Sequence, residues 1–219
     1  MSTQDLASDL VADKKAALKL TPVSRETAAR LDQFVELILK WQKAVQLVSA
    51  SSLSHLWTRH IADSLQLLDL APGARVWADL GSGGGFPGLV VAIALKDRAG
   101  AKMHLIESDQ RKSAFLREAV RVLGLPAMIH VKRIETVSLD ALPGLEVVTA
   151  RALAPLSELL GLAYPFLQNG AKGLFMKGAN LDNELTAATK SWNIRSTTVP
   201  SKTDAEGRIL LVDQVLRQN

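Results

Sequence analysis

A glycine-rich stretch at residues 76–88, VWADLGSGGGFPG, is the feature that most constrains the fold of this chain. It places five glycines and a proline behind a short apolar run that carries one aspartate. Backbone with so few side chains can be approached closely by another group. The stretch therefore predicts a strand that ends in a ligand-binding loop, for a phosphate, a dinucleotide or an adenosyl group.

Composition limits the class of protein that can carry this loop. The 219 residues are 47% hydrophobic and 22% charged, as in one soluble globular unit with a small appendage. No apolar run is long enough to span a membrane, and residues 1–20 lack the apolar core of a secretory signal, so we expect a cytoplasmic protein. The absence of cysteine excludes disulfides, thiolate metal sites and cysteine nucleophiles, and we expect no metal. The net charge of +4 suits a polyanionic partner and an ordinary basic surface equally well.

Three helical patterns precede the loop. Residues 3–20 are weakly periodic, and a second helix starts at Ser24, which is a good N-cap. A third pattern covers about 52–70, with its apolar residues on one face, and APG at 71–73 ends it. We therefore expect a helical cap over residues 1–72 and a second domain over 73–219.

Short apolar runs alternate with amphipathic segments after residue 75. This alternation predicts βαβ units and a parallel sheet. The last two strands are joined by a short linker without a helix, so they are expected to form an antiparallel hairpin. The seven expected strands are RVWADL, KMHLIE, AMIHV, LEVVTA, GLFMK, 192–199 and 208–216, and the expected helices are 87–98, 109–124, 155–168 and 181–190.

The neighbours of the glycines decide between the candidate ligands. No Gly-Lys-Ser/Thr follows, which excludes a P-loop. Gly83, Gly85 and Gly88 have the dinucleotide spacing, but the glycine that comes directly off the strand is Gly81. Pro87 moreover has no N–H to offer a pyrophosphate. The dinucleotide interpretation is therefore the weaker one.

Counted from the strand end, the pattern is Asp79-x-Gly81-x-Gly83-x-Gly85. This resembles the first motif of the Rossmann-like S-adenosylmethionine-dependent methyltransferases. An acid at the strand end, Asp79, would help to hold the ammonium group of the methyl donor directly or through water. Glu107, at the end of the next strand, would accept the two ribose hydroxyls. Each acid also has a purely structural interpretation. Asp79 would cap a turn, and Glu107 would be a neighbour of a helix N-cap.

The substrate class is narrowed by elimination. Methylation of a pyrimidine C5 normally uses a cysteine thiolate, which this chain lacks. Arg151 stands where an Asn/Asp-Pro-Pro-aromatic motif for amino-group methylation would follow the fourth strand. A ring nitrogen such as guanine N7 needs neither device, and positioning and electrostatics can supply the catalysis. We therefore expect no general base.

Basic residues are candidates for contact with the substrate. Arg59 and His60 lie on the expected polar side of the third helix, where an Arg59–Asp63 pair and a surface histidine are the simpler interpretation. Other basic residues recur near the ends of sheet elements, as solvated surface charges or as a track for phosphates. These are Arg111, Lys112, Lys132, Arg133, Lys172 and Lys177.

Several segments together resemble a specific family, the bacterial 16S rRNA (guanine-N7)-methyltransferases RsmG, also called glucose-inhibited division protein B. The matching segments, between about residues 30 and 180, are W41 with VQLVSA, RHIADSL, ADLGSGGGFPGLVVAI, LIESDQRKSAFL, TARALAPLSEL and MKG. The chain departs from the family pattern at Ile134, where alanine is common, and at Val45-Gln46, where Ile-Asn is more frequent.

The resemblance implies a Rossmann-like class I methyltransferase with a mostly parallel seven-stranded sheet, an antiparallel edge hairpin and an N-terminal helical cap. It implies S-adenosylmethionine as methyl donor and N7 of a guanine in 16S rRNA, within the small ribosomal subunit or its precursor, as acceptor. We expect a monomer. The motif and the resemblance together assign the cofactor to Asp79, Gly81, Gly83, Gly85, Phe86, Glu107, Ile134, Glu135 and Arg151. They assign the RNA to Arg59, His60, Arg151 and Lys177.

Two other functions fit the same residues. One is a methyltransferase of the same fold that acts on a small molecule or a protein. The other is a non-catalytic sensor that holds the adenosyl group as a ligand. A protein that only mediates interactions would leave the glycine loop unexplained.

Overall fold

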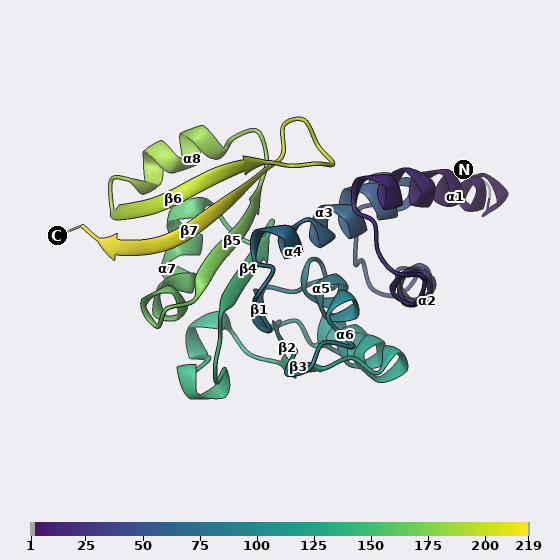
Figure 1. Ribbon diagram of the computed structural model, residues 1–219, viewed down its shortest axis with the longest axis horizontal. Coiled ribbons are helices and arrows are strands. Elements are labelled where there is room, and N and C mark those ends of the chain that lie inside the picture. The colour runs from purple at the N-terminus through teal and green to yellow at the C-terminus, as the bar shows by residue number, and fades with distance from the viewer. Residues whose placement is uncertain (1–2, 219) are drawn as a thin grey trace.

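The computed structural model describes residues 3–218. Its centre is a seven-stranded sheet with the strand order β3-β2-β1-β4-β5-β7-β6 (Figure 1). The first five strands of this order are parallel, while β7 is antiparallel to both β5 and β6. The predicted parallel sheet with an antiparallel edge hairpin is therefore confirmed.

The strands lie close to the apolar runs that predicted them. Their bounds are β1 Val76–Leu80, β2 Lys102–Ile106, β3 Ala127–His130, β4 Val147–Arg151, β5 Lys172–Lys177, β6 Trp192–Pro200 and β7 Arg208–Arg217. Because side chains alternate along a strand, neighbouring residues of β1 reach opposite faces of the sheet. Trp77 packs in one apolar cluster and Ala78 in the other, and both are fully buried.

Helices cover both faces of the sheet (Figure 1). One apolar cluster joins the sheet to α5 Gly88–Ala94, α6 Gln110–Leu123 and the N-terminal helices α1 Thr3–Leu20 and α2 Arg25–Trp41. The other joins it to α7 Leu156–Gln168 and α8 Leu181–Ala188. The crossovers also contain two short 3-10 helices, η3 Ile134–Thr136 and η4 Leu139–Ala141.

The N-terminal helices share a core with the sheet. Leu31, Phe34 and Ile38 of α2 are completely buried in the same cluster as Trp77. Ser24 caps α2 as predicted, since its hydroxyl oxygen accepts a hydrogen bond from the Thr27 N–H at 3.1 Å. The division into two domains at residues 72 and 73 stays a prediction. In the structure, the helices before this point and the sheet after it share one apolar cluster.

The third predicted helix is not one regular helix. It divides into a 3-10 helix η1 Ala50–His55, a π-helical segment η2 Trp57–Ala62 and two short α-helices, α3 Asp63–Leu65 and α4 Leu67–Leu70. The division coincides with a contact from α1, because the Asp13 carboxylate accepts the N–H groups of Trp57 and Thr58 at 2.8 and 3.2 Å. These bonds cap the start of η2 from outside the segment. Trp57 itself is part of the core, with 2% exposure.

Candidate active site

The predicted ligand loop lies at the carboxyl ends of the parallel strands, where open α/β sheets bind ligands. The N–H groups of Gly81 and Ser82 both donate to the Ile106 carbonyl oxygen at the end of β2, at 2.9 and 3.0 Å. Gly81 has a φ of +68°, and a Cβ there would lie 2.6 Å from Leu153 Cδ1. The loop thus needs glycine for its backbone conformation and for its close approach to the segment after β4.

Glu107 and the loop line a cavity of about 360 Å³, which we call the Glu107 cavity. The Glu107 carboxylate accepts the Gly83 N–H at 2.8 Å through one oxygen and the Asp109 N–H at 2.7 Å through the other. Two fixed donors therefore orient the carboxylate at the cavity wall. The other lining residues are Gly81, Ile106, Ser108, Lys112, Lys132, Arg133, Ile134, Glu135, Ala152, Leu153, Ala154, Glu158 and Leu162.

Asp79 lies behind the loop and not in the cavity wall. Its side chain is 1% exposed, and its carboxylate accepts the Gly88 N–H at 3.1 Å and the Thr149 hydroxyl at 2.9 Å. Burial raises the pKa of Asp79 to about 7. Asp79 links the start of α5 to β4 through these two hydrogen bonds, and its expected contact with a ligand, directly or through water, stays a prediction.

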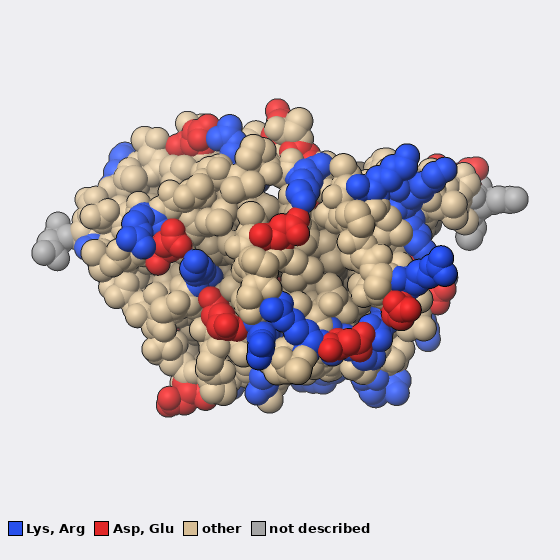
Figure 2. Space-filling model, in the orientation of Figure 1, with Lys and Arg blue, Asp and Glu red and all other residues tan. Residues whose placement is uncertain are grey.

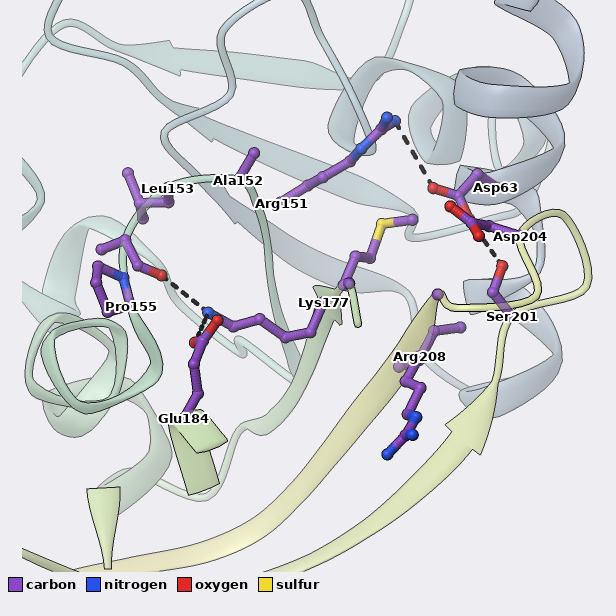
Figure 3. A pocket seen from close by; sticks show the side chains of 15 residues that line it. Asp63, Arg151, Ala152, Leu153, Pro155, Lys177, Glu184, Ser201, Asp204 and Arg208 are labelled. Carbon is purple, nitrogen blue, oxygen red and sulfur yellow. Dashed lines mark hydrogen bonds and ion pairs between the residues drawn. The ribbon is translucent and has the colours of Figure 1, made fainter. Parts of the chain in front are cut away.

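A second cavity, of about 430 Å³, lies at the carboxyl ends of β4 and β5 (Figure 3). We call it the Lys177 cavity. It shares the segment Ala152–Ala154 with the Glu107 cavity, so the same short stretch of chain borders both. The Lys177 ammonium donates to the Ala154 carbonyl oxygen at 2.8 Å and to Glu184 Oε2 at 2.7 Å. Glu184 was not predicted from the sequence.

Arg151 lines the Lys177 cavity on the side of the N-terminal helices (Figure 3). Its Nη1 atom is 3.8 Å from Asp63 Oδ2 and has no hydrogen-bond partner within residues 3–218, although it is buried. Burial lowers the pKa of the Arg151 guanidinium and raises the pKa of Asp63. Ala152 next to it has a φ of +48°, unusual for a residue with a side chain. A buried donor without a partner and a strained neighbour are both common at ligand sites.

His60 is not the surface histidine that the helical pattern suggested. Its ring lies 4.8 Å from the Phe86 ring between centroids, and both ring nitrogens are buried without a partner in the described part of the chain. Burial lowers the pKa of His60 to about 3, so the ring is neutral at physiological pH. The π-helical segment η2 and the packing of Phe86 turn this residue inward.

The expected Arg59–Asp63 pair is also absent among the ion pairs of residues 3–218. The Asp63 carboxylate instead pairs with Arg151 and accepts hydrogen bonds from Ser201 and Thr203 at 3.1 and 2.8 Å. Arg59 is exposed and lines a further cavity, of about 370 Å³, together with Asp63 and Arg151. The structure thus places Arg59, Arg151 and Lys177 in two neighbouring cavities near the carboxyl ends of β4 and β5.

Phe86 and Gly85, two other predicted cofactor residues, do not line the Glu107 cavity. Phe86 is 8% exposed and packs on the rings of Phe34 and His60. A Cβ on Gly85 would lie 2.4 Å from Leu89 Cδ1, so its glycine is required by packing within the loop. The predicted residues Gly81, Gly83, Glu107, Ile134 and Glu135 do line that cavity.

Comparison with known proteins decides the family. The family model described as GidB, rRNA small subunit methyltransferase G, matches residues 27–210. A Bradyrhizobium protein (strain BTAi1) named ribosomal RNA small subunit methyltransferase G is 54% identical over 210 residues, which cover 96% of this chain and 95% of that protein. The chain belongs to this family. It is thus a methyltransferase of the rRNA small subunit methyltransferase G family, and the resemblance drawn from its motifs is confirmed.

Other relatives agree with this assignment, and two solved structures share the fold. Proteins of the same name from Nitrobacter hamburgensis and Rhodopseudomonas palustris (strain BisB18) are 54% and 52% identical, over 95% and 96% of this chain and 80% and 90% of theirs. TrmN from Thermus thermophilus has a TM-score of 0.51 at 19% identity, over 72% of this chain and 49% of that one. A Klebsiella pneumoniae protein described provisionally as an O-methyltransferase has a TM-score of 0.55 at 14% identity, over 92% and 96%. These two structures support the methyltransferase fold alone.

Proposed function

We propose that this member of the rRNA small subunit methyltransferase G family transfers a methyl group from S-adenosylmethionine to N7 of a guanine in 16S rRNA, within the small ribosomal subunit or its precursor. The observation that carries the proposal is the pair of cavities that share residues 152–154. One cavity suits a methyl donor and the other an acceptor base. A reaction between two bound molecules requires such adjacent sites, because catalysis depends on holding the reacting atoms close together.

The residues of the Glu107 cavity fit the adenosyl group. A carboxylate whose orientation is fixed by two N–H groups is a suitable acceptor for the two ribose hydroxyls. Gly81 and Gly83 leave the backbone open to the methionine part. Ile134 offers buried apolar surface to the adenine ring, and Glu135 lies beside it. Asp79 supports this site from behind the loop, and Phe86 and Gly85 shape the loop.

When bound, S-adenosylmethionine supplies a sulfonium methyl group, which the lone pair of guanine N7 can attack. Guanine N7 carries no proton, so no residue of the chain has to act as a general base. The work of the protein is to orient the base and to exclude water. Arg151 directly precedes the shared segment and Lys177 is bonded to Ala154 within it, and each would orient an electron-rich group of the substrate.

The RNA would approach over the basic side chains around the two cavities. Lys112, Lys132 and Arg133 border the Glu107 cavity, and Arg59 and Arg151 border the further cavity of about 370 Å³, which shares Arg151 with the Lys177 cavity. Figure 2 shows further Lys and Arg side chains over the end of the molecule that carries the N-terminal helices, with acidic side chains between them. Phosphate contacts of this kind position a nucleic acid without reading its sequence. We propose a monomer, because a single chain contains both cavities, and a cytoplasmic location, because the proposed substrate is the ribosome.

The proposed function is tested by methyl transfer from labelled S-adenosylmethionine to small subunits that lack the modification. Naked 16S rRNA and a total protein extract serve as parallel substrates. Label in the RNA of the subunits is the expected result, and the comparison with naked RNA shows whether assembly matters. Label confined to protein, or binding of the donor without any transfer, would refute the proposal in favour of a protein or small-molecule enzyme or a non-catalytic sensor.

A further inference from the structure

The Lys177 cavity contains a charged pair at the segment that it shares with the Glu107 cavity. The side chains of Lys177 and Glu184 are only 9% and 21% exposed, and their atoms Nζ and Oε2 are 2.7 Å apart. They point toward each other from β5 and α8 (Figure 3). Taking both charges out of water costs free energy, so such a pair is weak evidence for a role in stability alone.

The hydrogen bonds of the pair leave one acceptor and one donor for a ligand. Glu184 Oε2 accepts from Lys177 and from the Leu156 N–H at 2.7 Å, while Glu184 Oε1 accepts no hydrogen bond from residues 3–218. The ammonium group has three N–H bonds, and two are used, on Glu184 and on Ala154. The pair thus keeps one carboxylate oxygen and one ammonium N–H without a partner among residues 3–218, and both side chains line the cavity.

Two other charged side chains of this cavity, those of Asp63 and Arg208, are engaged elsewhere, whereas Arg151 keeps a buried donor without a partner among residues 3–218. The Asp63 carboxylate is held by Arg151 and the β6–β7 loop, as described above. Arg208 Nη1 donates to both carboxylate oxygens of Asp182, at 2.7 and 2.9 Å. Its side chain extends away from Lys177 in Figure 3. Lys177 and Glu184 thus form a charged pair in the cavity lining that keeps both a donor and an acceptor for a ligand.

We propose that Lys177 and Glu184 select guanine as the acceptor base, an inference that rests on the proposed function. Guanine presents the acceptor O6 beside the donor N1–H, which match the ammonium and the carboxylate. Adenine presents a donor and an acceptor in the reverse order, so both contacts would be repulsive. A base must leave its stack to reach such a cavity, as enzymes that modify bases commonly require.

Two features of the reaction agree with a guanine that is held by Lys177 at O6 and by Glu184 at N1–H. O6 and N7 lie on the same edge of guanine, and Lys177 is bonded to Ala154 in the shared segment. In the proposed orientation, O6 contacts Lys177, N1–H contacts Glu184, and N7 faces the shared segment and the Glu107 cavity. Methylation at N7 also leaves a positive charge on the ring, and the Glu184 carboxylate near N1 stabilises this charge as it develops.

The test compares Glu184→Gln with the wild type on reconstituted small subunits. Their 16S rRNA, transcribed in vitro, carries guanine or adenine at the position that the wild type methylates. Glutamine keeps an oxygen for the Leu156 N–H but loses the charge, and we expect a rate on guanine at least about tenfold lower, with a smaller ratio of guanine to adenine rates. Asp213→Asn, which changes an exposed carboxylate beside Lys172, is the control and should leave both rates unchanged.

The ratio of rates separates base selection from a structural role. If Glu184 only supports the start of α7, a folded variant loses both rates together and keeps the wild-type ratio, and the proposal is overturned. A second measurement does not depend on RNA methylation: NMR titration of the wild type with GMP and with AMP. Shifts of the Leu156 and Lys177 amide signals are expected with GMP only, and their absence overturns the proposal. GMP-specific shifts in a protein that transfers no methyl group to RNA would refute the proposed function and leave this base pocket intact.

Discussion

Asp79 makes stability depend on pH in a way that one substitution should remove. The carboxyl group is 1% exposed beneath the glycine loop and accepts hydrogen bonds from the Gly88 N–H and the Thr149 hydroxyl. Burial disfavours its charged form and raises the pKa of Asp79 from 3.8 to about 7. Asp79→Asn keeps the shape and an acceptor oxygen but cannot ionise.

The magnitude follows from linkage between folding and proton binding. Below pH 3.8 Asp79 is protonated in both states, and its contribution to stability is fully present. Between 3.8 and about 7 the unfolded chain releases a proton that the folded chain retains, so the free energy of unfolding falls as pH rises. The difference between the two pKa values, 3.8 and about 7, corresponds at about 1.36 kcal/mol per pKa unit to a loss of at most about 4 kcal/mol in the free energy of unfolding.

Urea unfolding of both proteins at intervals from pH 4 to pH 8 measures this contribution. Other groups titrate in the same range, so the informative quantity is the free energy of unfolding of Asp79→Asn minus that of the wild type. We expect this difference to rise steadily up to about pH 7 and then to level off. A difference that stays constant across the range would refute the argument, because it would mean that Asp79 is charged in the folded protein with little cost.

Three further predictions concern the site and its support. Glu107→Ala should weaken S-adenosylmethionine binding at least about tenfold in calorimetry while the fold survives, because a charged acceptor at the cavity wall is lost. Gly88→Ala should lower the free energy of unfolding by about 2–4 kcal/mol in urea titrations, because the new Cβ would lie 2.4 Å from Leu105 Cδ2. His104→Gln should reduce the loss of stability in acid: burial lowers the pKa of His104 to about 4, so the wild-type protein loses stability as pH falls from 6.5 through about 4.

Each of these predictions has a control or a contrary result. Unchanged affinity in a folded Glu107→Ala protein would mean that the ribose lies elsewhere. Gly73→Ala is the matched glycine variant, because no atom lies within 4 Å of the Cβ that it adds, and it should leave stability nearly unchanged. If His104→Gln loses as much stability between pH 7 and pH 4.5 as the wild type does, the acid sensitivity arises at another group.

The sequence predicted those features that depend on local pattern. Apolar runs such as VWADL gave strands close to their observed bounds, and the short linker before Arg208 correctly predicted an antiparallel hairpin. The position of Glu107 beside the glycine loop also follows from local order, since the carboxyl ends of neighbouring parallel strands meet at one edge of the sheet.

Features that depend on contacts between distant residues could not be read in this way. Asp13 caps η2 from 44 residues away, so the 52–70 pattern could not show where the helix would change register. Asp79 and Glu107 look equivalent as acids at strand ends, but Asp79 is the last-but-one residue of its strand and faces the core, whereas Glu107 follows its strand. Glu184 carried a weak signal, the second of two acids at the start of α8, and only the fold places it in the same cavity as Lys177.

The most direct test of the central claim is the identity of the methylated atom. Small-subunit rRNA labelled by the wild-type protein would be digested to nucleosides and analysed by mass spectrometry, and the position would be mapped on larger fragments. The two adjacent cavities and the absence of any need for a general base predict a single 7-methylguanosine. Methyl groups on a different atom, such as a pyrimidine carbon or an exocyclic amine, would contradict the account of the site.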